Sequence, residues 1–221
     1  MFVTVNGYAY QRFDWPQIIK EAEQRGIAIR YHDRQGLSRI SKNGKQDQGV
    51  ARDVVCPNFM SLEAFMDLPE KPRSVLALDG VTNPQNVGMI IRSAVAAGVD
   101  GLLYPKRGIA SLGPLVIKAS AGNVFRAPII RCDATASAVT ALKAKGYQVA
   151  TLEASAETSL FEFKAADSVV CVLGGESDGI GKEVKALADT RLTIPMANGV
   201  ESLNVAVTAA LVSFHLGQTP D

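Results

Sequence analysis

From residue 74 onward, apolar segments of strand length alternate with segments of helical pattern, and no other feature limits the possible fold as strongly. The apolar segments lack a strict polar and apolar alternation, which indicates strands that are buried on both faces. Strand-type segments are 74–79, 101–104, 147–152, 168–173 and 191–195, and helical segments are 87–97, 134–145, 181–188 and 203–216. Buried strands separated by helices predict an α/β domain with a mostly parallel sheet.

The N-terminal part has a different pattern. Asp14 and Pro16 precede a helical segment that stops at Gly26, which predicts a capped helix. Residues 27–31 then have the composition of a short strand, and residues 67–73 combine two prolines with charged residues, as linkers do. We therefore expect a small domain over residues 1–70 and a larger one over 74–221.

Charge is nearly balanced, with 23 Lys and Arg against 22 Asp and Glu and a formal net charge of +1. This balance excludes a polybasic tail but permits a local patch that contacts RNA. The segment from 30 to 45 is such a candidate, and it could equally be a solvated loop and helix end. Its basic residues are Arg30, Arg34, Arg39, Lys42 and Lys45, against the single acid Asp33.

Cys56, Cys132 and Cys171 stand far apart, and the chain has only two histidines. This composition fits neither a disulfide framework nor a cysteine or histidine metal site, so we expect no metal. The first residues lack the pattern of a signal peptide, and no segment has the roughly 18 apolar residues of a membrane span. We expect a reduced, cytoplasmic protein with no membrane contact.

Three segments, each at the end of a strand, carry the polar residues that could perform chemistry; ligands of open α/β sheets bind at such ends. The first segment covers residues 86–94. Within it, Gly88 and Arg92 lie four residues apart, so they share one face of a helix. Glycine would leave that face open beside the guanidinium, whose planar fork suits phosphate or carboxylate. The alternative is a structural arginine that pairs with an acid or reaches solvent from a buried helix.

The second segment is Leu173-Gly-Gly-Glu-Ser-Asp-Gly-Ile-Gly181. Its four glycines would let backbone groups approach a ligand closely. It lacks both the GK[ST] ending of a P-loop and the GxGxxG spacing, which disfavours nucleotide hydrolysis. Glu176 is the polar exception; alternatively the segment is a tight turn with an acid at a helix start.

The third segment, IPMANGVESLNVAV from Ile194, contains the end of a strand, a turn at Asn198-Gly199 and the start of a helix near Ser202. Ser202 is either the helix N-cap or a site residue. Asn204, Thr208 and His215 follow roughly along one stripe of the helix. The helix is otherwise apolar nearly all round, which predicts burial on one side and a possible subunit contact on the other.

The three patterns NxGxxxRxA from Asn86, LGGExxGI from Leu173 and IPMxxGxxSLNVAVxxA from Ile194, in this order, resemble the signature motifs of the SpoU (TrmH-type) RNA ribose 2′-O-methyltransferases of the SPOUT superfamily. The resemblance covers about residues 74–216. Residues 118–122 also resemble the family's stretch between the first two motifs. Residues 34–38 and 47–51 resemble the end of the L30e-like RNA-binding domain that precedes many catalytic domains of this family, although Asp47 replaces the usual His and the domain would be partial.

The resemblance implies an α/β fold whose C-terminal segment forms a trefoil knot, and a homodimer with the C-terminal helix in its interface and both subunits in each active site. S-adenosylmethionine would be the cofactor, and tRNA or rRNA would be the substrate. The residues that match the family's cofactor-binding positions are Leu173, Gly174, Gly175, Ile194, Met196 and Leu203.

The resemblance further implies that Arg92 is the central catalytic residue, as a base or as a clamp on RNA phosphate. We favour the clamp, because arginine is effectively never deprotonated in proteins. Glu176 would orient Arg92 or Asn86. The catalytic set implied by the resemblance is Asn86, Arg92, Glu176, Ser202 and Asn204.

Two other classes compete with this interpretation. An RNA-binding module that keeps the fold without the chemistry is possible, although every polar motif position is filled here. A Rossmann oxidoreductase or a class I methyltransferase is disfavoured because no GxGxxG follows an early strand.

Overall fold

The computed structural model describes residues 2–3, 15–41, 50–51, 56, 58–176 and 178–217. The chain divides into two compact units, Met1–Val55 and Cys56–Asp221. This division precedes the boundary that we expected at 67–73. The proline-containing segment instead joins helix α3 (Leu62–Met66) to strand β4 (Ser74–Asp79) within the second unit, because the short strand β3 (Met60–Ser61) already pairs with the second unit's sheet.

In the first unit, strands β1 (Phe2–Val3) and β2 (Val50–Ala51) pair antiparallel, beside helices α1 (Trp15–Gln24) and α2 (Arg34–Ser41). The strand predicted over residues 27–31 is wrong: this segment joins the two helices, and the backbone N–H of Ile27 donates to Ala22 O at the end of α1. A strand requires a neighbouring strand, and residues 27–31 belong to neither of the two sheets that the structure describes. The expected cap at Asp14, the basic residues Lys42 and Lys45, and Asp47 lie outside the described residues.

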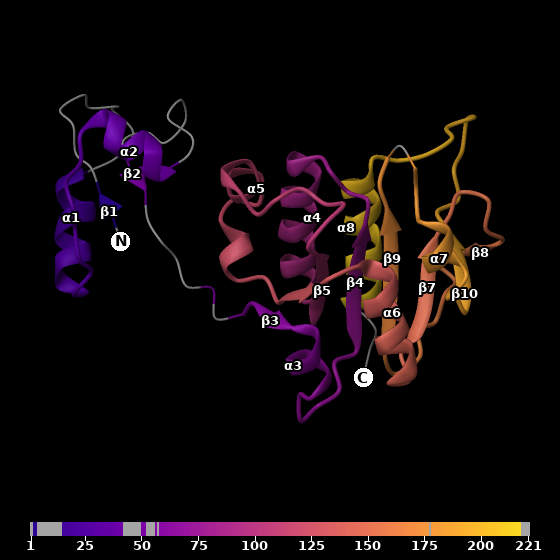
Figure 1. Ribbon diagram of the computed structural model, residues 1–221. Coiled ribbons are helices and arrows are strands. Elements are labelled where there is room, and N and C mark those ends of the chain that lie inside the picture. The colour runs from indigo at the N-terminus through magenta and orange to yellow at the C-terminus, as the bar shows by residue number, and fades with distance from the viewer. Residues whose placement is uncertain are drawn as a thin grey trace. The chain divides into compact units, whose positions relative to one another are not determined.

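The second unit is built on an all-parallel sheet, which confirms the predicted α/β class (Figure 1). Strands β3, β6 and β8, and helices α3 and α5, were not predicted. Across the sheet the strands follow the order β3, β6 (Ile129–Cys132), β5 (Gly101–Pro105), β4, β9 (Val169–Gly174), β7 (Gln148–Leu152), β10 (Thr190–Thr193) and β8 (Thr158–Ser159).

Helices cover both faces of this sheet, and alternate residues of β4 divide the core accordingly. Leu76 and Leu78 pack in the cluster that holds α4 (Pro84–Ala97), α5 (Pro114–Ala119) and α8 (Val205–Gly217). Val75 and Ala77 pack on the opposite face. That face is covered by α3, α6 (Thr135–Ala144) and α7 (Lys182–Lys185). Successive residues of a strand point to opposite faces of the sheet. Since helices cover both faces, the residues on both must be apolar, and this explains the continuous apolar runs.

Helices α4 and α8 pack side by side in the same direction. A Cβ added at Gly217 would lie 2.1 Å from Ala97 O, so the two C-terminal ends are in close contact. At the opposite ends, Asn204 Nδ2 lies 3.2 Å from Asn86 Oδ1. Both helix N-termini therefore meet at the edge of the sheet where the parallel strands end.

Helix α4 begins three residues before the predicted start. The Asn83 side chain accepts a hydrogen bond from Gln85 N, and Pro84 occupies the first helical turn, where its missing N–H costs nothing.

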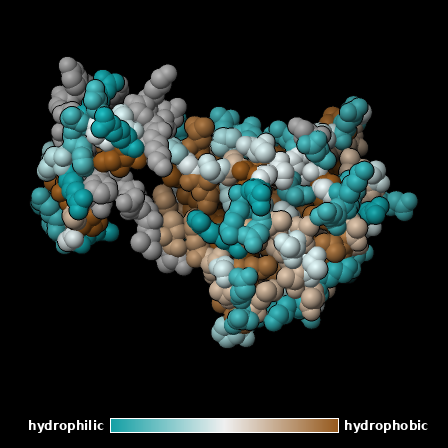
Figure 2. All heavy atoms as spheres, in the orientation of Figure 1, coloured by the Kyte–Doolittle hydropathy of each residue, from teal (hydrophilic) through white to brown (hydrophobic). Residues whose placement is uncertain are grey.

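No helix in the described part of the chain is long and apolar enough to span a membrane. On the side of the second unit seen in Figure 2, brown hydrophobic residues reach the surface between hydrophilic ones. Met89 on α4 and Val207 and Phe214 on α8 are 42%, 49% and 43% exposed.

Candidate active site

Asn86, Glu176 and Asn204 form a hydrogen-bonded triangle that joins the three motif segments. Glu176 Oε1 accepts from Asn86 Nδ2 at 2.9 Å and from Asn204 Nδ2 at 2.8 Å. Asn204 Nδ2 also donates to Asn86 Oδ1 at 3.2 Å. The structure thus brings together three of the five residues that were predicted to be catalytic, from positions up to 118 residues apart.

The sheet topology places this triangle. Strands β4 and β9 are neighbours, and the chain leaves β4 toward β5 on one side but leaves β9 toward the opposite side of the sheet. Ligands of open α/β sheets bind where the strand order reverses in this way. Asn86 lies in the first turn of α4, just after β4, and Glu176 follows β9 by two residues. The N-terminal dipoles of α4 and α8 both favour a negative charge at Glu176.

Asn204, and not Ser202, is the N-cap of α8. Its Oδ1 accepts from Ala206 N at 2.9 Å, and its carbonyl accepts the first helical hydrogen bond from Thr208 N. The predicted helix start near Ser202 is therefore two residues early. Ser202 is exposed in the loop before the helix, so its hydroxyl is not used for capping.

Two glycines of the second segment, Gly174 and Gly175, are needed for packing within the protein. A Cβ on Gly174 would lie 2.2 Å from Gly179 C, and a Cβ on Gly175 would lie 2.1 Å from Gly80 O. Asp79 holds the same loop, because its carbonyl accepts from Gly175 N and its Oδ2 accepts from Gly181 N, each at 2.8 Å. These contacts hold Gly175 and Gly181, on either side of Glu176 in the sequence, in place. Gly174, Gly175 and Gly179 also line the cavity described below, so the predicted close approach of their backbone to a ligand stays a prediction.

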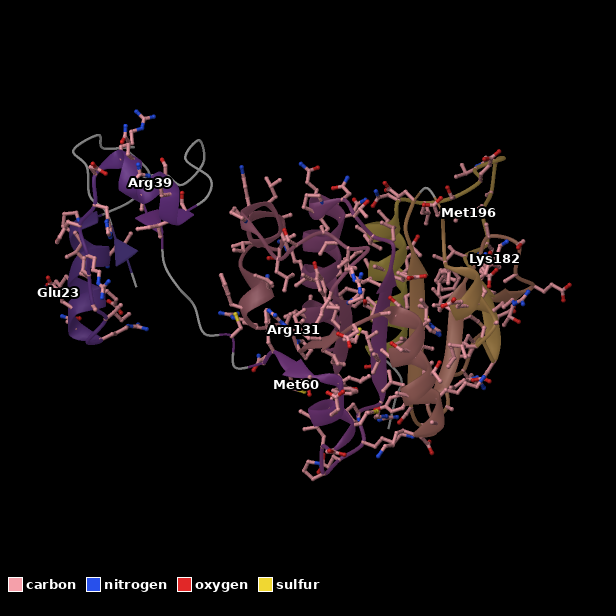
Figure 3. All side chains as sticks on the ribbon, in the orientation of Figure 1. Glu23, Arg39, Met60, Arg131, Lys182 and Met196 are labelled. Carbon is pink, nitrogen blue, oxygen red and sulfur yellow. The ribbon has the colours of Figure 1, made fainter. Side chains whose placement is uncertain are left out.

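A cavity of about 440 Å³ lies beside the triangle, at the ends of β7, β9 and β10. Glu176, Ser202 and Asn204 reach it, and Figure 3 shows Met196 on the segment between β10 and α8. All six residues predicted to bind the cofactor line this one cavity: Leu173, Gly174, Gly175, Ile194, Met196 and Leu203.

Arg92 is the predicted catalytic residue that the fold does not place with the others. It is exposed on α4, and neither Arg92 nor Asn86 lines the cavity. The face that it shares with Gly88 is not open either, because a Cβ on Gly88 would lie 2.4 Å from the Ala119 Cβ of α5. Gly88 therefore permits close packing of α4 on α5, and it does not make room beside the guanidinium.

Glu153 is a cavity residue that the sequence analysis missed. It directly follows β7, its side chain is 11% exposed, and Thr151 Oγ1 donates to Glu153 Oε1 at 2.9 Å. Its position at the end of a predicted strand was the signal that could have identified it.

By contrast, Cys171 on β9 is fully buried, and burial raises the pKa of its thiol to about 12, so it stays protonated at neutral pH.

Among the described residues, no group of three or more His, Cys, Asp or Glu side chains is placed to hold a metal ion.

The cavity offers apolar walls from Leu173, Leu192 and Ile194 together with carboxylates and amides. Fold and site thus define an α/β protein with a cavity suited to an organic ligand at the carboxyl edge of a parallel sheet. The sequence pattern of the SpoU rRNA Methylase family matches residues 73–214, and the chain belongs to this family.

Similar proteins agree with this assignment. A protein of Staphylococcus saprophyticus assigned to the TrmH family of tRNA/rRNA methyltransferases is 32% identical over 203 residues, which are 90% of this chain and 81% of the relative. The fold is similar to that of the SpoU methyltransferase AviRb from Streptomyces viridochromogenes in complex with AdoMet, with a TM-score of 0.70, 19% identity, and coverage of 98% and 81% of the two chains. The structure of an RNA 2′-O ribose methyltransferase gives a TM-score of 0.59 at 27% identity and covers 67% of this chain and 57% of that one.

Proposed function

We propose that the protein transfers a methyl group from S-adenosylmethionine to a ribose 2′-hydroxyl of tRNA or rRNA. The observation that carries the proposal is the Asn86–Glu176–Asn204 triangle, two members of which line one cavity. Membership of the SpoU family and the similarity to an RNA 2′-O ribose methyltransferase support it.

The cavity fits the cofactor by the chemistry of its lining. Apolar side chains would cover the faces of adenine, and backbone groups of Gly174 and Gly175 would meet its polar edges. Every charged residue described in the lining is an acid, which suits a ligand with a positively charged sulfonium. When bound, S-adenosylmethionine supplies an activated methyl group, and the protein must mainly align the attacking oxygen and help to remove its proton.

The triangle would position groups rather than react. Glu176 accepts from both amides, so the two Nδ2 groups are fixed and the Asn86 side chain, which is only 4% exposed, has one orientation. Arg92 would clamp an RNA phosphate beside the target ribose, where its fork supplies two parallel hydrogen bonds. Ser202, exposed at the cavity, would donate to the substrate or the cofactor.

We further propose a homodimer in which each active site combines the cavity of one copy with Arg92 of the other. Arg92 lies outside its own cavity and one turn from the exposed Met89, while Val207 and Phe214 are exposed on α8. Large apolar side chains exposed on packed helices favour a protein partner. By family resemblance, we also propose that the C-terminal segment forms a trefoil knot and that the first unit binds RNA as an L30e-like domain.

Methylation assays with a tritiated methyl donor and transcripts of tRNA and rRNA test this function. Digestion to nucleosides should yield a 2′-O-methylated nucleoside, and Arg92→Lys should lower the rate at least about tenfold by removing the bidentate grip. Arg126→Lys, at an exposed arginine outside the cavity, is the matched control and should keep the wild-type rate. Absence of cofactor binding would refute the proposal and favour an RNA-binding module.

Mixing inactive variants tests the shared site. If Arg92 acts on the partner's cavity, mixed dimers of Arg92→Lys and Glu176→Gln contain one intact site, and random mixing should restore about a quarter of the wild-type activity. No recovery after verified subunit exchange would show that each chain uses its own Arg92.

A further inference from the structure

The charged residues that line the cavity are all acids, namely Glu153, Glu176 and Glu201. No lysine, arginine or histidine that the structure describes is part of this lining. A wall with charges of one sign and apolar neighbours creates a potential that distinguishes ligands by charge.

The three carboxylates differ in how far the protein neutralises them. Glu153 is paired with two cations, because Lys185 Nζ lies 3.2 Å from its Oε2 and Arg191 Nε lies 3.8 Å from its Oε1. Glu176 receives hydrogen bonds from two amides, which carry no net charge and so do not neutralise it as a cation would. Within the described part of the chain, neither Glu176 nor Glu201 takes part in an ion pair.

We infer that Glu176 and Glu201 make the cavity selective for the cationic methyl donor over its neutral-sulfur product; this rests on the proposed function. Methyl transfer breaks the C–S bond, the electron pair stays on sulfur, and the proton of the ribose hydroxyl is lost to the surroundings. The sulfur therefore loses its positive charge, and the attraction of the two carboxylates for the sulfur is lost with it. The cavity thus favours release of the product after each turnover.

The size of the effect follows from the dimensions of the site. In a cavity of about 440 Å³, a carboxylate in the wall lies roughly 8 Å or less from a ligand charge. At an effective dielectric constant of about 40, intermediate between surface and bulk water, one such carboxylate changes the relative affinity about fivefold.

Titration calorimetry with three ligands tests this inference without any turnover. S-Adenosylmethionine and sinefungin carry a positive charge at the reacting position, the first on sulfur and the second on an amine, whereas S-adenosylhomocysteine is neutral there. The readout is the ratio of the Kd of S-adenosylhomocysteine to the Kd of sinefungin. We expect this ratio to fall about fivefold in Glu201→Gln and in Glu176→Gln, with the Kd of S-adenosylhomocysteine nearly unchanged.

Glu162→Gln is the matched control, because Glu162 is exposed and does not line the cavity; its ratio should equal that of the wild type. In the wild type the ratio should also fall as salt rises, since ions screen exposed charges. Equal ratios in wild type, Glu201→Gln and Glu176→Gln would overturn the inference, as would a ratio that salt leaves unchanged. Failure of the wild type to bind any of the three ligands would instead overturn the proposed function.

Discussion

Replacing Asn204 by aspartate probes the triangle at one atom. The aspartate keeps the oxygen that accepts from Ala206 N, and Asp caps helices about as well as Asn. The change removes the donor that lies 2.8 Å from Glu176 Oε1 and puts a second carboxylate in its place.

The magnitude follows from this distance. Two unit charges 2.8 Å apart repel by about 1.5 kcal/mol even at the dielectric constant of bulk water. Loss of the charge-assisted hydrogen bond adds about 1 kcal/mol, a value reduced because both side chains are exposed. We expect the free energy of unfolding of Asn204→Asp to be about 2–3 kcal/mol below that of the wild type near pH 8.

The effect should depend on pH with a defined sign. In the folded variant, the adjacent carboxylates raise the pKa of the pair above its value in the unfolded chain. Stability is therefore retained below the unfolded pKa of about 4 and is lost as the pH rises through the folded pKa. The deficit should be small near pH 4.5 and large near pH 8.

Urea unfolding at these two pH values measures the deficit, with Asn204→Ser as the control. Serine keeps a capping oxygen and removes the amide without adding charge. If Asn204→Asp and Asn204→Ser are equally stable near pH 8, or if the deficit is the same at both pH values, the argument from charge repulsion is refuted.

Three further changes should have measurable effects. Gly88→Val should lower the free energy of unfolding by about 1–3 kcal/mol in urea titrations, because its side chain would collide with Ala119; unchanged stability would contradict the packing described here. Gly175→Ala should weaken binding of S-adenosylmethionine by calorimetry, because its Cβ would displace the loop from Gly80. Asp189→Asn should lower the free energy of unfolding by about 1 kcal/mol near pH 7, because the hydrogen bond from Lys143 lowers the pKa of Asp189 in the folded protein. In the wild type this stabilisation is lost as the pH falls toward that pKa, so the deficit of the variant should disappear there. A deficit that persists at low pH would contradict this cause.

The strands of the second unit could be predicted because burial on both faces leaves a continuous apolar signal. Ser74–Asp79 was predicted at its observed bounds, and the other four predicted strands overlap the observed ones. The four-residue β6 and the six-residue α5 were missed, since elements of this length carry little periodicity. The strand expected over 27–31 shows the opposite error, because strand composition alone cannot supply a pairing partner.

For the site, the family resemblance of the three motifs identified Asn86, Glu176 and Asn204, whereas the role inferred for Gly88 from its spacing was wrong. Asn86, Glu176 and Asn204 meet because three strand ends share one edge, which a parallel sheet requires. Gly88 was interpreted as leaving space beside the Arg92 guanidinium, whereas a Cβ at Gly88 would lie 2.4 Å from the Ala119 Cβ of α5. Close tertiary packing of this kind depends on contacts between distant segments, and no local pattern encodes it.

The strand order also constrains how the chain can reach its native state during synthesis. Ser74 on β4 pairs with Val169 on β9, which is inserted between β4 and β7, so one side of the central strand stays uncovered until most of the polypeptide has left the ribosome. Contacts between residues so distant in the chain slow folding, and an unpaired apolar strand edge invites aggregation meanwhile. A nascent chain truncated before β9 should therefore depend on chaperones.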